Sequence, residues 1–112
     1  MRISVVICTH NPRMDYLYRT LDGLRGQSLP TSEWELVIVD NKSNDPLTRR
    51  VDLSWHKVSR VVREQNLGLT PARLRGIQET IGDIVVFVDD DNILAESYLS
   101  NVLRIHREHP FL

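Results

Sequence analysis

The chain has 112 residues, which fits a single domain, residues 1–112, with one hydrophobic core. Its 41% hydrophobic and 26% charged residues exclude disordered and membrane-embedded classes, and the net charge of −1 offers no positive surface for nucleic acid. No apolar run approaches the length of a membrane span, about 18 residues, and the single cysteine, Cys8, predicts an inert thiol in a protein of the reducing cytoplasm.

Four strands are predicted, because apolar and β-branched residues cluster in four short runs. The fourth run is continuous, which is typical of a strand buried on both faces, whereas the third alternates as a strand nearer a sheet edge does. The runs cover residues 3–9, 34–40, 57–63 and 83–89.

Helices are predicted where apolar residues recur at intervals of three and four. The predicted helices cover residues 13–26, 70–82 and 97–107. Thr70-Pro71 is expected to start the second as N-cap and first helical residue, and Pro110 to stop the third. Residues 46–54 are weakly helical at best. The second helix is expected to bury one face, which carries Ala72, Leu74, Ile77 and Ile81.

Alternation of strands and helices predicts an α/β fold, a Rossmann-like parallel sheet of four strands in the order 3-2-1-4 with right-handed crossovers. In that order, the second and third strands are added on one side of the first strand and the fourth strand on its other side, so the strand order reverses between the first and fourth strands. Ligands of such sheets bind in the crevice outside the carboxyl ends of the strands at that point. The sequence predicts a site there, because three strands end in polar groups, at Thr9-His10-Asn11, Asp40 and Asp89-Asp90-Asp91.

The three successive carboxylates carry the strongest chemical signal. Two carboxylates about 4 Å apart repel by roughly 4 kcal/mol at an effective dielectric constant near 20. Mg²⁺ or Mn²⁺ relieves such repulsion and usually bridges to phosphates. We expect Asp91, together with Asp89, to hold the metal, and Asp90 or Asn92 to lie near a ribose. The alternative is an acidic turn that caps the next helix.

The other strand ends offer contacts for a nucleoside diphosphate. Thr9 and Asn11 either contact the nucleoside or form a turn, and Asp40 either accepts hydrogen bonds from the base or ribose or closes an Asx turn. His10, in the same loop, fits a structural role better than that of a general base.

Other polar and aromatic residues carry weaker signals. Arg73 and Arg75 cannot share one helix face, so one is expected at the site and the other in solvent. Trp34 and Trp55 are expected to be core or interface anchors. Three histidines lack metal-ligand spacing and are expected at the surface: His56, His106 and His109. Dinucleotide-binding, P-loop and serine or cysteine nucleophile motifs are absent from the sequence.

Four segments carry a resemblance to a known family, and they stand in order at suitable separations: Val5–Asn11, Leu36–Asp45, Asn66–Gly68 with Ala72-Arg73, and Val88–Asp91. Together they resemble the nucleotide-binding half of family 2 glycosyltransferases, inverting enzymes of the GT-A fold. The resemblance covers nearly the whole chain. It implies a sugar-nucleotide donor, commonly UDP- or GDP-linked, with Mg²⁺ or Mn²⁺ bound by an Asp-x-Asp motif.

The matching positions imply roles for particular residues. Asp40 would read the base, Asp89 and Asp90 would lie near ribose and metal, and Asp91 would be the main metal ligand. Asn66 and Arg73 would join Thr9, His10 and Asn11 in binding the nucleotide. The pair Asn41-Lys42 departs from the Asp-Gly that the family often has there, which affects the base contact more than the fold.

The resemblance also implies a longer enzyme of the hexosyltransferase type. The general base and the site for a glycan, lipid or protein acceptor belong to a later half of the family fold. We therefore expect an N-terminal portion, in the cytoplasm or at the cytoplasmic membrane face, that binds donor weakly and transfers no sugar alone. A free sheet edge is expected to favour a homodimer. These residues do not identify the sugar, the base or the acceptor.

Two other functions fit parts of the pattern. One is a non-catalytic nucleotide- or metal-binding module. The other is a receiver-like phosphoacceptor domain, which needs an acidic pair after the first strand and a lysine at a late strand end. Thr9-His10-Asn11 stands at the first place, and neither Lys42 nor Lys57 is late.

Overall fold

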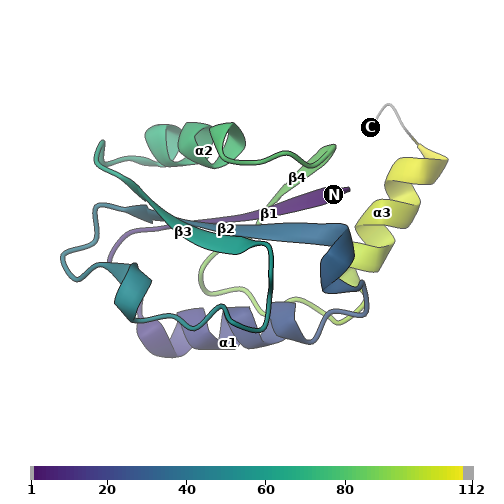
Figure 1. Ribbon diagram of the computed structural model, residues 1–112, viewed down its shortest axis with the longest axis horizontal. Helices are drawn as coiled ribbons and strands as arrows, with labels where there is room; N and C mark the ends of the chain where they lie inside the picture. The colour runs from purple at the N-terminus through teal and green to yellow at the C-terminus, as the bar shows by residue number, and fades with distance from the viewer. Residues whose placement is uncertain (1, 110–112) are drawn as a thin grey trace.

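The computed structural model describes residues 2–109 and has a central sheet between helical layers. Both α1 and α2 run along the sheet, on opposite faces, and α3 lies at the end where the strands begin (Figure 1). The strands are β1 Ile3–Thr9, β2 Trp34–Asn41, β3 Ser59–Glu64 and β4 Ile84–Phe87. The helices are α1 Met14–Arg25, α2 Leu69–Gln78 and α3 Tyr98–Glu108, with 3₁₀ turns η1 Thr31–Glu33 and η2 Leu47–Arg49.

The sheet has the predicted topology. All pairs are parallel and the strand order is β3-β2-β1-β4, so β1 is paired on both sides. Thr9 stands opposite Asp40, and Val6 stands opposite Phe87. Every carboxyl end therefore lies at the same end of the sheet, as the predicted parallel topology requires.

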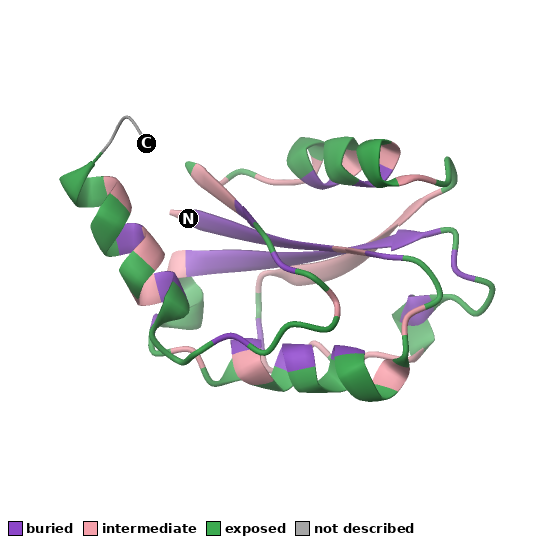
Figure 2. Cartoon of the chain, turned by 180° about the vertical axis from the view of Figure 1, so that it is seen from behind, coloured by how far each residue is buried: buried purple, intermediate pink, exposed green. Residues whose placement is uncertain are grey.

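Two apolar clusters cover the two faces of the sheet, because successive side chains of a strand point to opposite sides. Val5 and Ile7 of β1 belong to the larger cluster, with α1 and α3, and Val6 belongs to the smaller one, beneath α2. Figure 2 shows the two central strands buried over most of their length. None of the helices within residues 2–109 has the length and apolar character needed to cross a bilayer.

Helix α2 differs from its prediction at both ends. It begins at Leu69, because the amide of Ala72 already donates to the carbonyl of Gly68 at 3.2 Å. Pro71 then falls within the first turn, where helical amides lack an intrahelical partner in any case. The helix stops at Gln78 and not at position 82, because Ile81 donates its amide to a carboxylate oxygen of Glu35 at 2.7 Å.

The buried face of α2 was also wrongly predicted. Of the four residues expected to face the sheet, only Ala72 does so, together with Gly76. Leu74 and Ile77 are 54% and 49% exposed. This face carries small residues because the helix lies very close to the strands. A Cβ on Gly76 would be 2.5 Å from Cγ1 of Val6.

Strand β4 is shorter and less covered than predicted. Its ladder spans Ile84–Phe87, although the amide of Val88 still donates to the carbonyl of Val6 at 2.9 Å. Phe87 is 40% exposed, because β4 is an edge of the described sheet. β3 is the other edge, as expected, and a homodimer through a free edge stays a prediction. Pro110, the expected stop of α3, lies outside the described residues.

His56 is buried, contrary to the expectation that it lies at the surface. Its ring stands edge-on to Trp34, with the ring centres 4.3 Å apart, and its Nδ1 accepts the amide hydrogen of Val58 at 3.1 Å. Burial lowers the pKa of His56, which keeps the ring neutral. Trp34 is fully buried, as expected for a core anchor.

The close approach of α2 gives a direct test. We expect Gly76→Ala to destabilise the fold by about 1–3 kcal/mol, because the new methyl group overpacks against a stiff valine. Urea unfolding at pH 7 measures the difference. Gly26→Ala is the matched control, since its Cβ would have no neighbour closer than 3.6 Å. Equal stability of Gly76→Ala and the unmodified chain would contradict the close packing.

Candidate functional site

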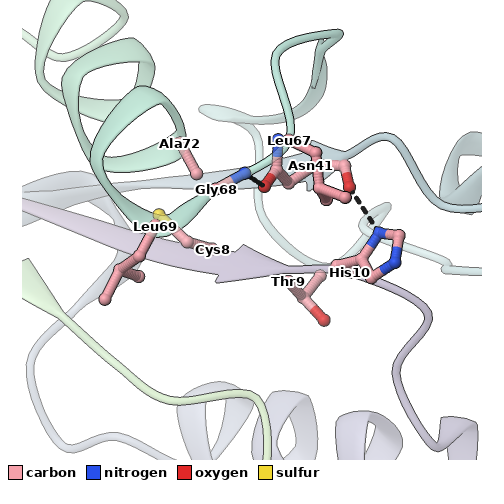
Figure 3. Close-up of a pocket in the computed structure, with 8 residues that line it drawn as sticks. All are labelled: Cys8, Thr9, His10, Asn41, Leu67, Gly68, Leu69 and Ala72. Carbon is pink, nitrogen blue, oxygen red and sulfur yellow. Dashed lines mark hydrogen bonds between the residues drawn. The ribbon is translucent and has the colours of Figure 1, made fainter.

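A cavity of about 220 Å³ opens where β1 and β2 end and α2 begins. Figure 3 shows Cys8 of β1 beside the start of α2, with Asn41 and His10 on the side of the loops, whereas the hydroxyl of Thr9 points away from the other lining residues. It is lined by Cys8, Thr9, His10, Asn41, Leu67, Gly68, Leu69 and Ala72.

A second cavity, of about 560 Å³, adjoins the first and shares His10 and Leu67 with it. Its other lining residues are Asn11, Lys42, Ser43, Asn44 and Arg63. Three of the predicted nucleotide contacts therefore line one or both of these cavities: Thr9, His10 and Asn11.

Hydrogen bonds join the loop after β1 to the loop after β2. Nδ1 of His10 lies 2.7 Å from the carbonyl oxygen of Asn41, which can only accept, so Nδ1 carries the proton. Asn11 donates its amide to Oγ of Ser43 at 2.9 Å, and its Oδ1 accepts the amide hydrogen of Asn44 at 2.8 Å. His10 thus has the structural role that the sequence favoured for it.

Asp40 lines neither cavity, and the structure supports the turn alternative for this residue. Its carboxylate is 1% exposed and accepts the amides of Ser43 at 3.1 Å and Leu47 at 3.0 Å. Arg63 forms an ion pair with the same carboxylate, with its Nη1 3.1 Å from Oδ2 of Asp40. Burial alone would raise the pKa of Asp40, but these hydrogen bonds and the guanidinium outweigh it and hold the pKa below its usual value. Reading of the base by Asp40 is therefore corrected: the carboxylate is already occupied.

The side chains of the acidic segment after β4, residues 89–91, differ in their surroundings. Asp90 turns toward β1, where its carboxylate accepts the hydroxyl hydrogen of Thr9 at 2.5 Å. Asp89 and Asp91 are exposed, and no ion pair engages either carboxylate within residues 2–109. Asp91 lines a depression of about 280 Å³ against α1, beside Tyr16.

The acidic segment fits a metal shared with phosphates better than a closed protein cage. No group of three or more His, Cys, Asp or Glu side chains converges within the described range 2–109. Mg²⁺ needs only one or two protein carboxylates when substrate phosphates supply further oxygens. Asp89 and Asp91 offer two such carboxylates, and Asp90 is bound to Thr9.

The two arginines of α2 lie apart, but neither lines the two cavities, and a role for Arg73 at the site stays a prediction. Arg75 is held by Glu79 at 3.0 Å and Glu64 at 3.7 Å, so it is ion-paired and not simply solvated. Arg73 is exposed, with its guanidinium 5.5 Å from the ring centre of Phe87. Asn66 is exposed at the rim and lines neither cavity.

Cys8 is half-buried in the wall of the smaller cavity. Burial raises the pKa of its thiol to about 11, against a smaller lowering by the positive charge of Arg73. The thiol is therefore protonated at neutral pH and unsuited to act as a nucleophile, as predicted.

Sequence reasoning missed Asn41 as a site residue, although its position was noted as a departure from a family pattern. Asn41 lines the smaller cavity. Lys42 has φ of 56°, a left-handed conformation that favours glycine, which explains the Gly of the common Asp-Gly pair. Leu67, Gly68 and Leu69 were missed because no local pattern distinguishes a cavity wall from an ordinary loop.

The sequence was compared with protein-family models and with known proteins. The sequence model of glycosyl transferase family 2 matches residues 4–112. Poly(ribitol-phosphate) beta-N-acetylglucosaminyltransferase TarS of Staphylococcus aureus is 30% identical over 113 residues, which cover 97% of this chain. The match spans only 19% of the length of that relative.

Solved structures agree with this match. The crystal structure of TarS 1–349 from S. aureus in complex with UDP-GlcNAc has a TM-score of 0.85 and 25% identity, covering 98% of this chain and 32% of its own. The mannosyltransferase PcManGT from Pyrobaculum calidifontis, in complex with GDP-Man and Mn²⁺, has a TM-score of 0.81 and 26% identity. That match covers 94% of this chain and 32% of PcManGT. This chain is thus similar to about a third of each solved structure.

The occupied carboxylate of Asp40 makes stability depend on pH. Because its pKa is lower in the folded than in the unfolded chain, its contribution is present above about pH 4 and is lost as pH falls through the folded pKa. We expect Asp40→Asn to cost about 2 kcal/mol at pH 7, since an amide cannot accept all these bonds, and the cost to shrink toward pH 3. Urea unfolding over this range measures both.

The matched control for Asp40→Asn is Asp45→Asn, because the Asp45 carboxylate is exposed and, among residues 2–109, forms an ion pair only with Arg50, at 3.3 Å. It should change stability by less than about 0.5 kcal/mol at any pH. A cost for Asp40→Asn that does not vary with pH would contradict a lowered pKa.

Proposed function

The chain belongs to glycosyl transferase family 2, and from this membership we propose that it is the donor-binding portion of an inverting hexosyltransferase that uses a UDP- or GDP-linked sugar. The observation that carries the proposal is the double role of Thr9. The residue lines the smaller cavity, and its hydroxyl, which points away from the other lining residues, donates to Asp90 of the acidic segment (Figure 3). A nucleoside pocket and a phosphate–metal region would thus share one residue.

The smaller cavity suits the nucleoside and not the whole donor. Its volume of about 220 Å³ is below the roughly 300–1,000 Å³ that enclose a drug-sized ligand. Leu67, Leu69 and Ala72 provide apolar surface for the face of a base, and His10 provides a polar edge. The diphosphate would then leave the cavity toward the exposed carboxylates that follow β4.

In the proposed complex, Asp91 and Asp89 would hold Mg²⁺ or Mn²⁺, which would supply positive charge to the departing diphosphate. Asp90 keeps the segment attached to β1 through Thr9. Arg73 adds positive charge on the α2 side of the cavity, where it already acts on Cys8. The solved PcManGT complex with GDP-Man and Mn²⁺ supports this choice of donor class and metal.

Acceptor binding and proton removal belong, in this proposal, to other parts of the enzyme. The chain spans 19% of the length of TarS. Within residues 2–109, no carboxylate is placed in either of the two adjoining cavities to serve as general base. The acceptor would be a glycan, a lipid or a protein, and the cytoplasmic location stays a prediction from the single cysteine.

Family membership decides against the receiver-like alternative. A non-catalytic nucleotide-binding module remains the second candidate, and only a test of transfer with the longer enzyme separates it from a transferase.

Donor binding is tested by titrating UDP, GDP, CDP and ADP with and without Mn²⁺ by calorimetry. We expect one diphosphate to bind with Mn²⁺, and Asp91→Asn to weaken this binding about tenfold or more. The bound nucleotide should also slow alkylation of Cys8, which lines the cavity and is the chain's single cysteine.

The control for Asp91→Asn is Asp83→Asn, which removes an exposed carboxylate just before β4, at the opposite end of the strand. It should leave affinity unchanged. Failure of every diphosphate to bind the folded chain, or binding that leaves Cys8 as reactive as before, would count against this cavity as the donor site.

We further expect the 112-residue chain alone to transfer no sugar, because the proposed acceptor site and general base lie elsewhere. The measurement is transfer of radiolabelled sugar from the donor to glycan, lipid and protein acceptors, with donor hydrolysis followed in parallel. The full-length enzyme serves as positive control. Acceptor-dependent transfer by the isolated chain would overturn this division of labour, and an inactive full-length enzyme would favour the binding module.

A further inference from the structure

Asn41 connects three loops at the cavity, and its side chain is 4% exposed. Its Nδ2 donates to the carbonyl of Glu64 at 3.2 Å and to that of Asn66 at 2.9 Å. Its Oδ1 accepts the amide hydrogen of Gly68 at 2.9 Å, and its backbone carbonyl accepts the proton of His10 (Figure 3).

Only a primary amide of this length makes this set of side-chain bonds. Nδ2 has two hydrogens and both are used, while Oδ1 is used as an acceptor. A carboxylate has no hydrogen to donate, so an aspartate would face two carbonyl oxygens with negative charge. The pattern Asp-Gly, which the family often has here, therefore cannot form this network with its ionised aspartate.

The bonds of Asn41 reach the loop that forms one cavity wall. The β2–β3 ladder ends at the pair Asn41–Glu64. Beyond it, the described hydrogen bonds from the loop to β2 go to the side chain of Asn41. The same loop carries Leu67 and Gly68 of the wall, and the carbonyl of Gly68 accepts the first helical hydrogen bond of α2, from the amide of Ala72.

We propose that Asn41 is a positioning residue, whose amide sets the β3–α2 loop and the start of α2 at the spacing that the nucleoside requires. This inference rests on the proposed donor site. A loop held in its binding conformation before the ligand arrives does not have to be ordered on binding, which increases affinity. The side chain acts through the loop, because its polar hydrogens are all engaged by the protein.

The test replaces the amide with a carboxylate of the same shape, Asn41→Asp. The matched control is Gln65→Glu, which makes the same chemical change in the same loop at an exposed side chain with no hydrogen bond among those described. Asn41→Ala, which is neutral and smaller, also removes the acceptor of the Gly68 amide. Hydrogen exchange, Cys8 alkylation and nucleotide affinity are measured on each.

Without nucleotide, we expect exchange of the Gly68 amide to rise at least about tenfold in Asn41→Ala, which removes its acceptor, and alkylation of Cys8 to accelerate in both variants, while amides of β1 and β2 keep their protection. Nucleotide affinity should fall about tenfold or more. The ratio of affinities with and without Mn²⁺ should stay as in the unmodified chain, because the acidic segment is untouched. Gln65→Glu should match the unmodified chain in all four measurements.

Two results would overturn the inference: unchanged Gly68 exchange in Asn41→Ala, or a loosened loop with unchanged nucleotide affinity. A uniform rise in exchange across the sheet would also overturn it, since Asn41 would then be a general stability residue. Absence of nucleotide binding by the unmodified chain would instead overturn the proposed donor site, so the two failures are distinguishable.

Discussion

Parallel pairing of β1 on both of its sides is the constraint on which the rest of the structure depends. Because β2 and β4 run in the same direction as β1, their carboxyl ends reach the same edge of the sheet. Thr9 then lies opposite Asp40 on one side and within hydrogen-bond distance of Asp90 on the other. Strand pairing alone thus brings together Thr9 and Asp90, which are more than eighty positions apart in the sequence.

The second determinant is the closeness of α2 to the sheet. Ala72 and Gly76 present so little side chain that the helix lies against Val6 and Val39. The start of α2 is thereby held over the end of β1, where it forms one wall of the cavity. Larger residues of the helix face outward as a consequence, although their spacing alone favoured burial.

The polar groups at the sheet edge divide into those that build the loops and those that stay available. Asp40 and Asn41, adjacent in sequence, are both almost fully buried, and each satisfies its side chain within the loops that follow the strands. A buried polar group without a hydrogen bond destabilises the fold, and these two residues therefore use their side chains to hold the loops in place. Asp89 and Asp91 are exposed and can take part in binding.

The sequence by itself determined the fold class, the strand order and the edge at which the site forms, because β-branched runs and short crossovers leave few alternative topologies. It also indicated Thr9, His10, Asn11 and the acidic segment, because polar residues directly after buried strands need a reason to be there. Only the tertiary structure decided which polar side chains face the cavity and which support it. That choice depends on partners distant in sequence: Arg63 for Asp40, Gly68 for Asn41 and Thr9 for Asp90. Local pattern carries no information on such partners, so it left Asp40 open between a ligand contact and a turn and did not indicate Asn41.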